Sequence, residues 1–405
     1  LLARGALAPA LRREARWLRR WAARFAESVR CDGAEAAAVA DVDHDGRPEL
    51  LLVGTDGIRC GRFEGGRWRE LARGPLPDAM GTIEACLGGD VLGDGRDELV
   101  VAGGDRQLGR SLRVFRIERT GERLSLRTMA RLPLAAHADA AGLALARTGA
   151  ASGGELLVAR AAEGGRQGWR VQLGPEGELL TRALCGALAP LARVEAVAAA
   201  DVDGDGRDEA LVGTRGPGGR DVRLGESAAS PAGGTRWRRR IGAVEAIVPV
   251  DLDRDGALDL ALGLDRSADR STGRSWPPAS VVVLDAGLTA RPGRRTIVPL
   301  VPAEPQRWSA RFAALLAADL HASGAPALCA LVQTWRTDHG ASPPRRRLLV
   351  CCERADDRLR VLRIVLPEGT FGWALTADLD LDGDDELVFG GPRQAVVVGL
   401  RRRGP

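Results

Sequence analysis

The chain has 405 residues, with a hydrophobic fraction of 45% and an aromatic fraction of 4%, so aliphatic residues and alanine must fill its core. Its 58 basic and 54 acidic residues give a formal net charge of +4, which predicts neither a nucleic-acid partner nor a membrane-surface partner. No apolar run reaches the length of about 18 residues that a transmembrane helix needs, so no such helix is expected. The seven cysteines form no CxxC or zinc spacing, which favours buried thiols over a disulfide framework.

The first segment, residues 1–30, is expected to form an arginine-rich amphipathic helix or a linker. Trp17, Leu18, Trp21 and Phe25 recur at helical spacing, and arginines separate them. Such a helix either packs its tryptophan face on the main body or lies on a membrane surface.

A nine-residue pattern, D-x-D-x-D-G-x-x-[D/E], organises the rest of the chain. It occurs at 41–49, 201–209, 251–259 and 378–386, each time followed by a short apolar run that ends in Gly. A fifth copy at 90–98 has Leu92 in its third position. Two further stretches keep the strand–loop–strand outline without the acids, one at 143–159 and one that begins at Asp319.

The first unit shows how each repeat is built. Short apolar runs at 36–40, 50–53, 58–63 and 68–72 are separated by the Asp loop and by glycine-containing turns, which predicts four antiparallel strands. Seven such units follow one another at intervals of roughly 50–70 residues, close to the period of propeller blades. The predicted fold is all-β: a seven-bladed β-propeller of four-stranded antiparallel blades over 31–405, preceded by a short N-terminal helix.

The last unit has only three strands after residue 372, the third of them at 394–400. Because an open sheet edge is a liability, we expect a segment near Ala26–Cys31 to supply the fourth strand.

The Asp loop has the composition of a calcium site. Acids at positions 1, 3 and 5 converge, Gly at position 6 permits the turn, position 7 offers its carbonyl, and the acid at position 9 closes the shell. Oxygen ligands of this kind suit Ca²⁺ better than Mg²⁺ or zinc, and the EF-hand loop opens in the same way. The predicted ligands are Asp41, Asp43, Asp45, Arg47, Glu49, Asp201, Asp203, Asp205, Arg207, Glu209, Asp251, Asp253, Asp255, Ala257, Asp259, Asp378, Asp380, Asp382, Asp384, Glu386 and, in the loop with Leu92, Asp90, Asp94 and Glu98. Leu92 predicts that this last site is weak or empty, and the loop at Asp319, which has His321, Ser323 and Ala327 in place of acids, is expected to have lost its site.

The repeated D-x-D-x-D-G-x-x-[D/E] loop followed by an apolar run and Gly resembles the FG-GAP (VCBS) repeat of integrin α-subunit-type seven-bladed β-propellers. The resemblance covers about residues 34–405. It implies that the calcium ions lie in the hairpin between the first two strands of a blade and stiffen it. It also implies an adhesion, lectin-like or scaffold role more often than an enzymatic one.

Three classes of function are compared. The first is a calcium-stabilised, non-catalytic module that binds protein or carbohydrate through its loops, with Trp276 and the arginine-rich insertions at 265–280 and 336–347 as contact candidates. The second is a carbohydrate-active propeller, a polysaccharide lyase or hydrolase, although His137, His321 and His339 show no catalytic spacing. The third is nucleic-acid binding through Arg236–Arg240, where a charged outer strand is the simpler interpretation.

We therefore expect a non-enzymatic protein with Ca²⁺ as its cofactor, a protein or carbohydrate partner, and no nucleic acid. Modest calcium affinities of about 10⁻⁴–10⁻³ M, typical of extracellular modules, favour an extracellular, periplasmic or cell-surface location over a cytoplasmic scaffold.

Overall fold

The structure is a computed structural model in which the described part of the chain is built from β-strands and no helix. The described residues are 28–29, 34–64, 67–77, 80–105, 109–134, 140–147, 154–162, 165–184, 193–202, 204–215, 221–225, 235–240, 243–265, 280–285, 295–300, 308–320, 324–336, 345–355, 358–366, 372–391 and 394–398. The helix expected within residues 1–30 lies almost wholly outside them. No helix in the described ranges is long and apolar enough to cross a membrane.

The strands follow one another as antiparallel meanders along the chain. The first three meanders comprise β2 (Ala36–Ala40), β3 (Glu49–Gly54), β4 (Gly57–Glu64) and β5 (Arg67–Gly74); β6 (Met80–Gly89), β7 (Glu98–Asp105), β8 (Gly109–Thr120) and β9 (Arg123–Pro133); and β10 (Ala140–Ala146), β11 (Glu155–Ala162), β12 (Gly165–Leu173) and β13 (Leu179–Leu184). The next three comprise β14 (Arg193–Ala200), β15 (Glu209–Arg215), β16 (Asp221–Gly225) and β17 (Thr235–Arg240); β18 (Ala243–Val250), β19 (Asp259–Asp265), β20 (Ser280–Asp285) and β21 (Arg295–Pro299); and β22 (Trp308–Ala318), β23 (Ala327–Arg336), β24 (Arg345–Ala355) and β25 (Arg358–Leu366). The last comprises β26 (Trp373–Ala377), β27 (Glu386–Gly391) and β28 (Gln394–Val398).

The meanders form five four-stranded sheets and one eight-stranded sheet among the described strands. The eight-stranded sheet consists of the first two meanders, joined by one parallel bridge between Arg73 of β5 and Arg123 of β9. Gly74 permits this close approach, because a Cβ at that position would lie 2.1 Å from the carbonyl oxygen of Leu124. The first two meanders are therefore separate sheets that touch at one edge.

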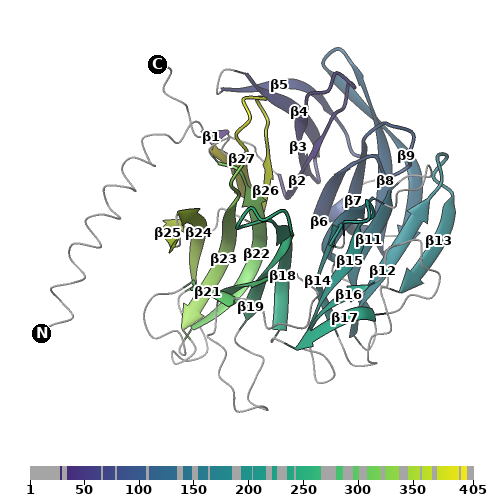
Figure 1. Ribbon diagram of the computed structural model, residues 1–405. Coiled ribbons are helices and arrows are strands. Elements are labelled where there is room, and N and C mark those ends of the chain that lie inside the picture. Colours follow the sequence, from purple (N-terminus) through teal and green to yellow (C-terminus); the bar gives the residue numbers. More distant parts are fainter. Residues whose placement is uncertain are drawn as a thin grey trace, which may run out of the picture.

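The first strands of the meanders form a closed ring. Each contacts the first strand of the next meander, and the last contact closes the circle between β26 and β2. Figure 1 shows the sheets arranged around a common centre, with these first strands toward the middle. Four-stranded sheets placed radially in this way make a β-propeller, as expected from the repeat.

The ring is closed by a strand from the other end of the chain. β1 (Ser28–Val29) pairs antiparallel with β28, with Ser28 opposite Val396 and Val29 opposite Ala395. The sheet order is therefore β1-β28-β27-β26, and the prediction that Ala26–Cys31 supplies the missing strand is confirmed. This pairing protects an edge of β28 that would otherwise be open.

The core lies between the faces of neighbouring sheets. One cluster of buried side chains joins the first two meanders, with Leu51 and Phe115 among its members, and another joins the fifth and sixth. Alanines at 36, 38 and 40 alternate on β2, so small side chains occupy the part of the ring where the strands crowd together. Aliphatic residues and alanine thus replace aromatic residues in the core, as the composition indicates.

The described cysteines Cys60, Cys86, Cys329, Cys351 and Cys352 are free thiols, as expected for buried small apolar residues. Cys329 and Cys351 face each other across β23 and β24, and their sulfur atoms are 3.1 Å apart.

Candidate calcium loops and a surface pocket

The Asp loops all occupy the same place in the fold. Each joins the first strand of its meander to the second, which is the hairpin that the FG-GAP resemblance implies. The acid at position 9 begins the second strand in every case: Glu49 in β3, Glu98 in β7, Glu209 in β15, Asp259 in β19 and Glu386 in β27.

Backbone hydrogen bonds to the first acid shape the loop. The N–H of position 6 donates to one oxygen of the position 1 carboxylate, at 2.8–3.1 Å in the loops that begin at residues 41, 90, 201, 251 and 378. The glycine at position 6 has a positive φ in all five loops. The backbone at position 4 also adopts the left-handed conformation, with φ values of 57° at His44, 62° at Arg254 and 60° at Leu381. The sequence pattern predicted the turn at position 6 from its glycine and missed the left-handed residue at position 4.

The closing acid ties the two ends of the loop together. One oxygen of Glu49 accepts the N–H of Val42 at 2.7 Å, and Glu386 accepts that of Leu379 at 2.7 Å. Glu209 makes the same bond to Val202 at 2.8 Å. The bond engages the same oxygen, Oε2, in all three carboxylates.

The loop at 378–386 has the donor set of a calcium site. Asp378, Asp380 and Glu386 each offer one carboxylate oxygen, all within 4.8 Å of one another. Oδ1 of Asp378 is buried and accepts no hydrogen bond. Burial raises the pKa of Glu386 to about 8, and the N–H of Leu379 opposes this shift while Asp380, Asp382 and Asp378 add to it. A hard divalent cation would compensate these carboxylates, so the residues fit Ca²⁺.

The loop at 251–259 fits the ion for the same reason. Asp251, Asp253 and Asp255 bring one oxygen each within 4.8 Å of one another, and Oδ1 of Asp251 is a second buried acceptor without a hydrogen bond. Asp285 of β20 lies opposite the closing acid Asp259, which adds another carboxylate to this end of the sheet.

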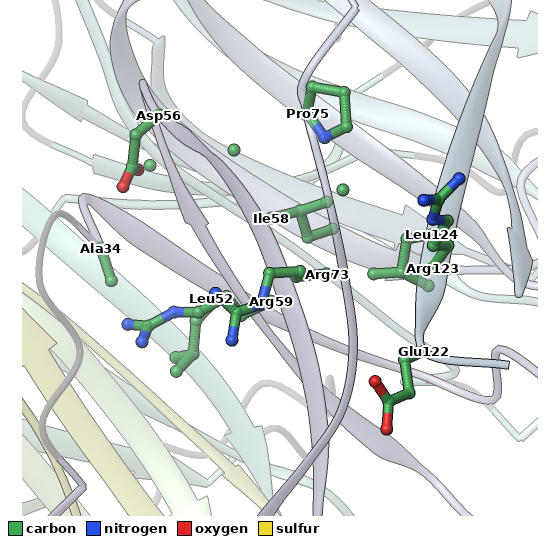
Figure 2. Close-up of a pocket in the computed structure, with 13 residues that line it drawn as sticks. Ala34, Leu52, Asp56, Ile58, Arg59, Arg73, Pro75, Glu122, Arg123 and Leu124 are labelled. Carbon is green, nitrogen blue, oxygen red and sulfur yellow. The ribbon is translucent and has the colours of Figure 1, made fainter.

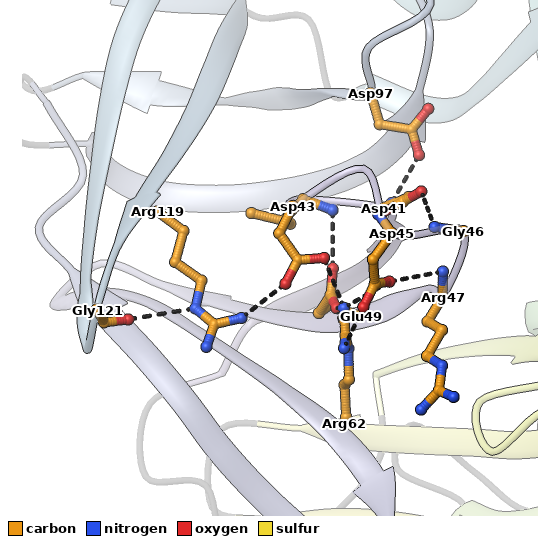
Figure 3. Close-up of polar contacts among 11 residues, drawn as sticks. Asp41, Asp43, Asp45, Gly46, Arg47, Glu49, Arg62, Asp97, Arg119 and Gly121 are labelled. Carbon is orange, nitrogen blue, oxygen red and sulfur yellow. Dashed lines mark hydrogen bonds and ion pairs between the residues drawn. The ribbon is translucent and has the colours of Figure 1, made fainter.

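The loop at 41–49 brings its acids together around an arginine that was not predicted (Figure 3). The guanidinium of Arg62, from β4, donates to Asp43 at 2.7 Å, to the two oxygens of Asp45 at 2.8 and 2.9 Å, and to Glu49. Arg119 donates to the second oxygen of Asp43 at 2.9 Å. Burial raises the pKa of Glu49, although the Val42 N–H and Arg62 oppose the shift.

The loop at 90–98 repeats the arrangement with fewer acids. Arg116 of β8 donates to Asp94 at 2.6 Å and to Glu98 at 3.0 Å. Leu92 is fully buried in the core, where it cannot act as a ligand. Burial raises the pKa of Glu98 to about 7 despite the hydrogen bonds from Arg116 and Leu92.

The remaining loops are known in part. Asp203 lies outside the described residues, whereas Asp201 accepts the N–H groups of Asp205 and Gly206 at 3.0 and 2.8 Å. The oxygens of Asp319 likewise serve the loop, since Asp319 accepts the N–H of Gly324. Ala327 occupies the closing position of that loop and is buried.

The expectation that the third unit lacks acids is wrong at one position. Glu155 begins β11, where the other units place the closing acid. Its carboxylate accepts three hydrogen bonds from Arg170 of β12, at 3.0–3.1 Å, and both side chains are buried. The register of the strands, which is not evident from the spacing alone, reveals this equivalence.

The acids at position 8 have a role that the pattern did not suggest. Asp97, Asp208 and Asp385 each accept a backbone N–H from the preceding unit, from Asp41, Arg147 and Asp319 respectively, all at 2.7 Å. The backbone N–H of Asp208 also donates to the carbonyl of Arg147 at 2.8 Å, and that of Asp385 donates to the carbonyl of Asp319 at 2.9 Å. We call this two-way contact the inter-unit clasp; it joins neighbouring meanders at the loop end of the ring.

A pocket of about 600 Å³ lies where the first two meanders touch (Figure 2). Buried apolar residues line it, Leu52, Ile58 and Leu124 among them. The arginines in its lining are Arg59, Arg73 and Arg123, and the acids are Asp56 and Glu122. Nη2 of Arg59 is buried and has no hydrogen-bond acceptor.

Most of the residues expected to contact a ligand or to act in catalysis lie outside the described part of the chain. Trp276, His137, His321, His339 and most of both insertions lie outside the described residues. The arginines at 236 and 238–240 lie on β17, an edge strand of its sheet, as expected for a charged outer strand.

Residues 41–101, from the first Asp loop to β7, match the family model of the FG-GAP-like repeat. This segment is an FG-GAP-like repeat. The match includes the Asp41 and Asp90 loops, in both of which an arginine contacts the acids. No curated protein is significantly similar to the chain in sequence.

Solved structures share the fold at low identity. Rhamnogalacturonan lyase YesW is 15% identical, with a TM-score of 0.52, and the match covers 91% of this chain and 72% of that one. Rhamnogalacturonan lyase PL11 of Bacillus licheniformis is 14% identical, with a TM-score of 0.52, and the match covers 91% of this chain and 72% of that one. Exotype rhamnogalacturonan lyase YesX is 14% identical, with a TM-score of 0.50, and the match covers 93% of this chain and 74% of that one. At these identities the likeness concerns the fold alone.

Proposed function

We propose that this FG-GAP-like repeat protein is a calcium-stabilised, seven-bladed β-propeller that acts as a non-catalytic binding module for protein or carbohydrate. Support for seven blades comes from the sheets, when the two halves of the eight-stranded sheet are counted separately and added to the five four-stranded sheets. An integrin-like arrangement is compatible with this count. The observation that carries the calcium assignment is the pair of buried, unbonded Asp oxygens, Asp251 Oδ1 and Asp378 Oδ1, within groups of converging carboxylates.

The calcium ions would be held in the loops 251–259 and 378–386. When bound, calcium supplies positive charge to carboxylates that otherwise repel each other by roughly 1–4 kcal/mol for each close pair. The chain's own contribution is to fix the loop: the backbone N–H groups hold position 1, and the closing acid holds both ends. Calcium is thus assigned a structural role in each hairpin.

A non-catalytic role agrees with the use of the loop acids. Those acids accept backbone hydrogen bonds within their loops or across the inter-unit clasp, so they hold the loops and the neighbouring units in place. Ligand contact is assigned instead to the pocket between the first two meanders. Arg59, whose Nη1 lies 4.0 Å from Glu70, is one of the three arginines in the lining, and a guanidinium suits a ligand that carries a carboxylate.

The second candidate function is that of a carbohydrate-active propeller. The named rhamnogalacturonan lyases have the same fold, and the three arginines beside an apolar floor would suit an acidic sugar. Under either function, structural calcium of modest affinity favours an extracellular, periplasmic or cell-surface location over a cytoplasmic scaffold.

One experiment separates the two functions. Calcium-loaded protein is titrated with oligosaccharides of rhamnogalacturonan, with oligogalacturonate and with neutral galactan, and the same mixtures are followed for the ultraviolet absorbance of unsaturated products. Saturable binding of an acidic oligosaccharide without turnover, weakened by Arg59→Met, supports a binding module. Turnover would establish the enzyme instead, and the absence of binding to any saccharide would leave a protein partner as the remaining ligand class.

A further inference from the structure

The residue that faces the closing acid across the second and third strands differs between units. Glu98 of β7 lies opposite Arg116 of β8. In the first unit Leu50 pairs with Gly61, so the next residues along, Glu49 and Arg62, face each other in the same way. In the fifth unit the residue opposite Asp259 is Asp285, an acid in place of an arginine.

In the first two units the arginine occupies the place of a cation. Arg62 donates to acids at positions 3, 5 and 9, which are three of the predicted metal ligands. Its side chain is only 13% exposed and that of Glu49 is fully buried, so the pair lies inside the loop. A guanidinium bound to these oxygens uses the lone pairs that calcium would need.

Arg119 strengthens the arrangement in the first unit. It comes from β8 of the second unit, donates to Asp43 at 2.9 Å and also contacts the carbonyl of Gly121. The four acids of the loop, Asp41, Asp43, Asp45 and Glu49, thus have two arginines beside them. Two of the four formal negative charges are therefore offset by arginines from outside the loop.

In the loops at 41–49 and 90–98, Oδ1 of the position 1 acid accepts the position 5 N–H at 3.1 Å, whereas the loops at 251–259 and 378–386 differ at that atom. Each keeps a buried Asp oxygen without a hydrogen bond, and the described charged groups that act on Glu386 are all carboxylates.

We propose that Arg62 and Arg116 are built-in cations that replace calcium in the loops 41–49 and 90–98, so the chain's calcium sites are confined to its other Asp loops, 251–259 and 378–386 among them. In the first, second and fifth units, the side chain opposite the closing acid distinguishes the two kinds of loop. This inference rests on the proposed calcium stabilisation for the metal-binding loops, but the arginine assignment is tested separately from it.

The test counts bound calcium by equilibrium dialysis of the full chain. Asp43, Asp253 and Asp380 all occupy position 3 of their loops, so Asp43→Asn, Asp253→Asn and Asp380→Asn are matched variants. Asp253→Asn and Asp380→Asn are each expected to lose one bound ion, whereas Asp43→Asn should lose none. Arg62→Gln should gain one ion, and Arg59→Gln, on the same strand but away from the loop, should gain none.

Loss of an ion in Asp43→Asn, or no gain in a folded Arg62→Gln, would overturn the arginine assignment. If Arg62→Gln does not fold, the Asp43→Asn result decides. A wild-type protein that binds no calcium would contradict the proposed function; the arginine assignment would then stand if Arg62→Gln gained an ion and fall if it did not.

Discussion

The inter-unit clasp at Asp208 gives a sharp prediction about what holds neighbouring blades together. Asp208 is 6% exposed, and its carboxylate accepts the N–H of Arg147 at 2.7 Å. The Asp208→Ala variant removes a hydrogen bond to a charged acceptor, worth about 1.5–3 kcal/mol, and leaves a backbone N–H without its partner. We expect the free energy of unfolding to fall by about 2–3 kcal/mol.

Two further variants locate the source of this energy. Asp208→Asn keeps an acceptor oxygen without the charge, so about half of the loss should remain. Arg147→Ala keeps the backbone N–H and removes only the guanidinium, whose Nε lies 3.7 Å from Asp208 and whose side chain is 87% exposed. Such an exposed ion pair contributes little, so this change should be close to neutral.

The assay is equilibrium urea unfolding in calcium-saturated buffer, followed by tryptophan fluorescence, with all variants compared at the same protein concentration. A loss below about 0.5 kcal/mol for Asp208→Ala would refute the clasp as a stabilising contact. A large loss for Arg147→Ala would show that the side-chain ion pair, and not the backbone N–H, carries the interaction.

Three other changes test packing, backbone conformation and a buried ion pair. Gly74→Ala should lower the free energy of unfolding by about 1–3 kcal/mol, because the added Cβ would meet the Leu124 carbonyl. In the same urea unfolding assay Gly372→Ala should be tolerated, because a Cβ there points into open space. Equal effects of the two changes would contradict the close approach at Gly74. Leu381→Asn should raise the stability by about 1 kcal/mol, because Leu381 holds a φ of 60° and asparagine tolerates that conformation better; an unchanged thermal midpoint would argue against strain at position 4. Arg170→Gln should lower the free energy of unfolding by about 3–5 kcal/mol, since it leaves Glu155 buried without its cation, and a neutral result would contradict a stabilising role for this ion pair.

The repeat period and the position of each loop were predictable from the sequence because both depend on local rules. Alternating turn residues and short apolar runs define the meander, and an unpaired last strand must find a partner, which β1 supplies. The closing acids of the five Asp loops could be identified for the same reason, since each directly precedes an apolar run, but Glu155 of the third unit was missed because its loop lacks the other acids.

The partners of those acids could not be predicted from spacing. Arg62, Arg116 and Arg170 reach the closing acids from the third strand, and only the register places them there. The acids at position 8 contact another unit 56–66 residues away in the chain, so no local pattern reveals the clasp. The pocket likewise depends on the edge contact between β5 and β9, a consequence of Gly74.

Structural calcium is tested most directly by the thermal midpoint of the full chain with calcium and with a chelator, for the wild type and for the double variant Asp251→Asn, Asp378→Asn. Each ion present at 100 times its dissociation constant stabilises the folded state by about 2.7 kcal/mol, so removal of two ions should lower the wild-type midpoint by about 5–6 °C in a chain of this length. The double variant should start lower and respond far less. A wild-type midpoint that is the same with calcium and with chelator would contradict the account.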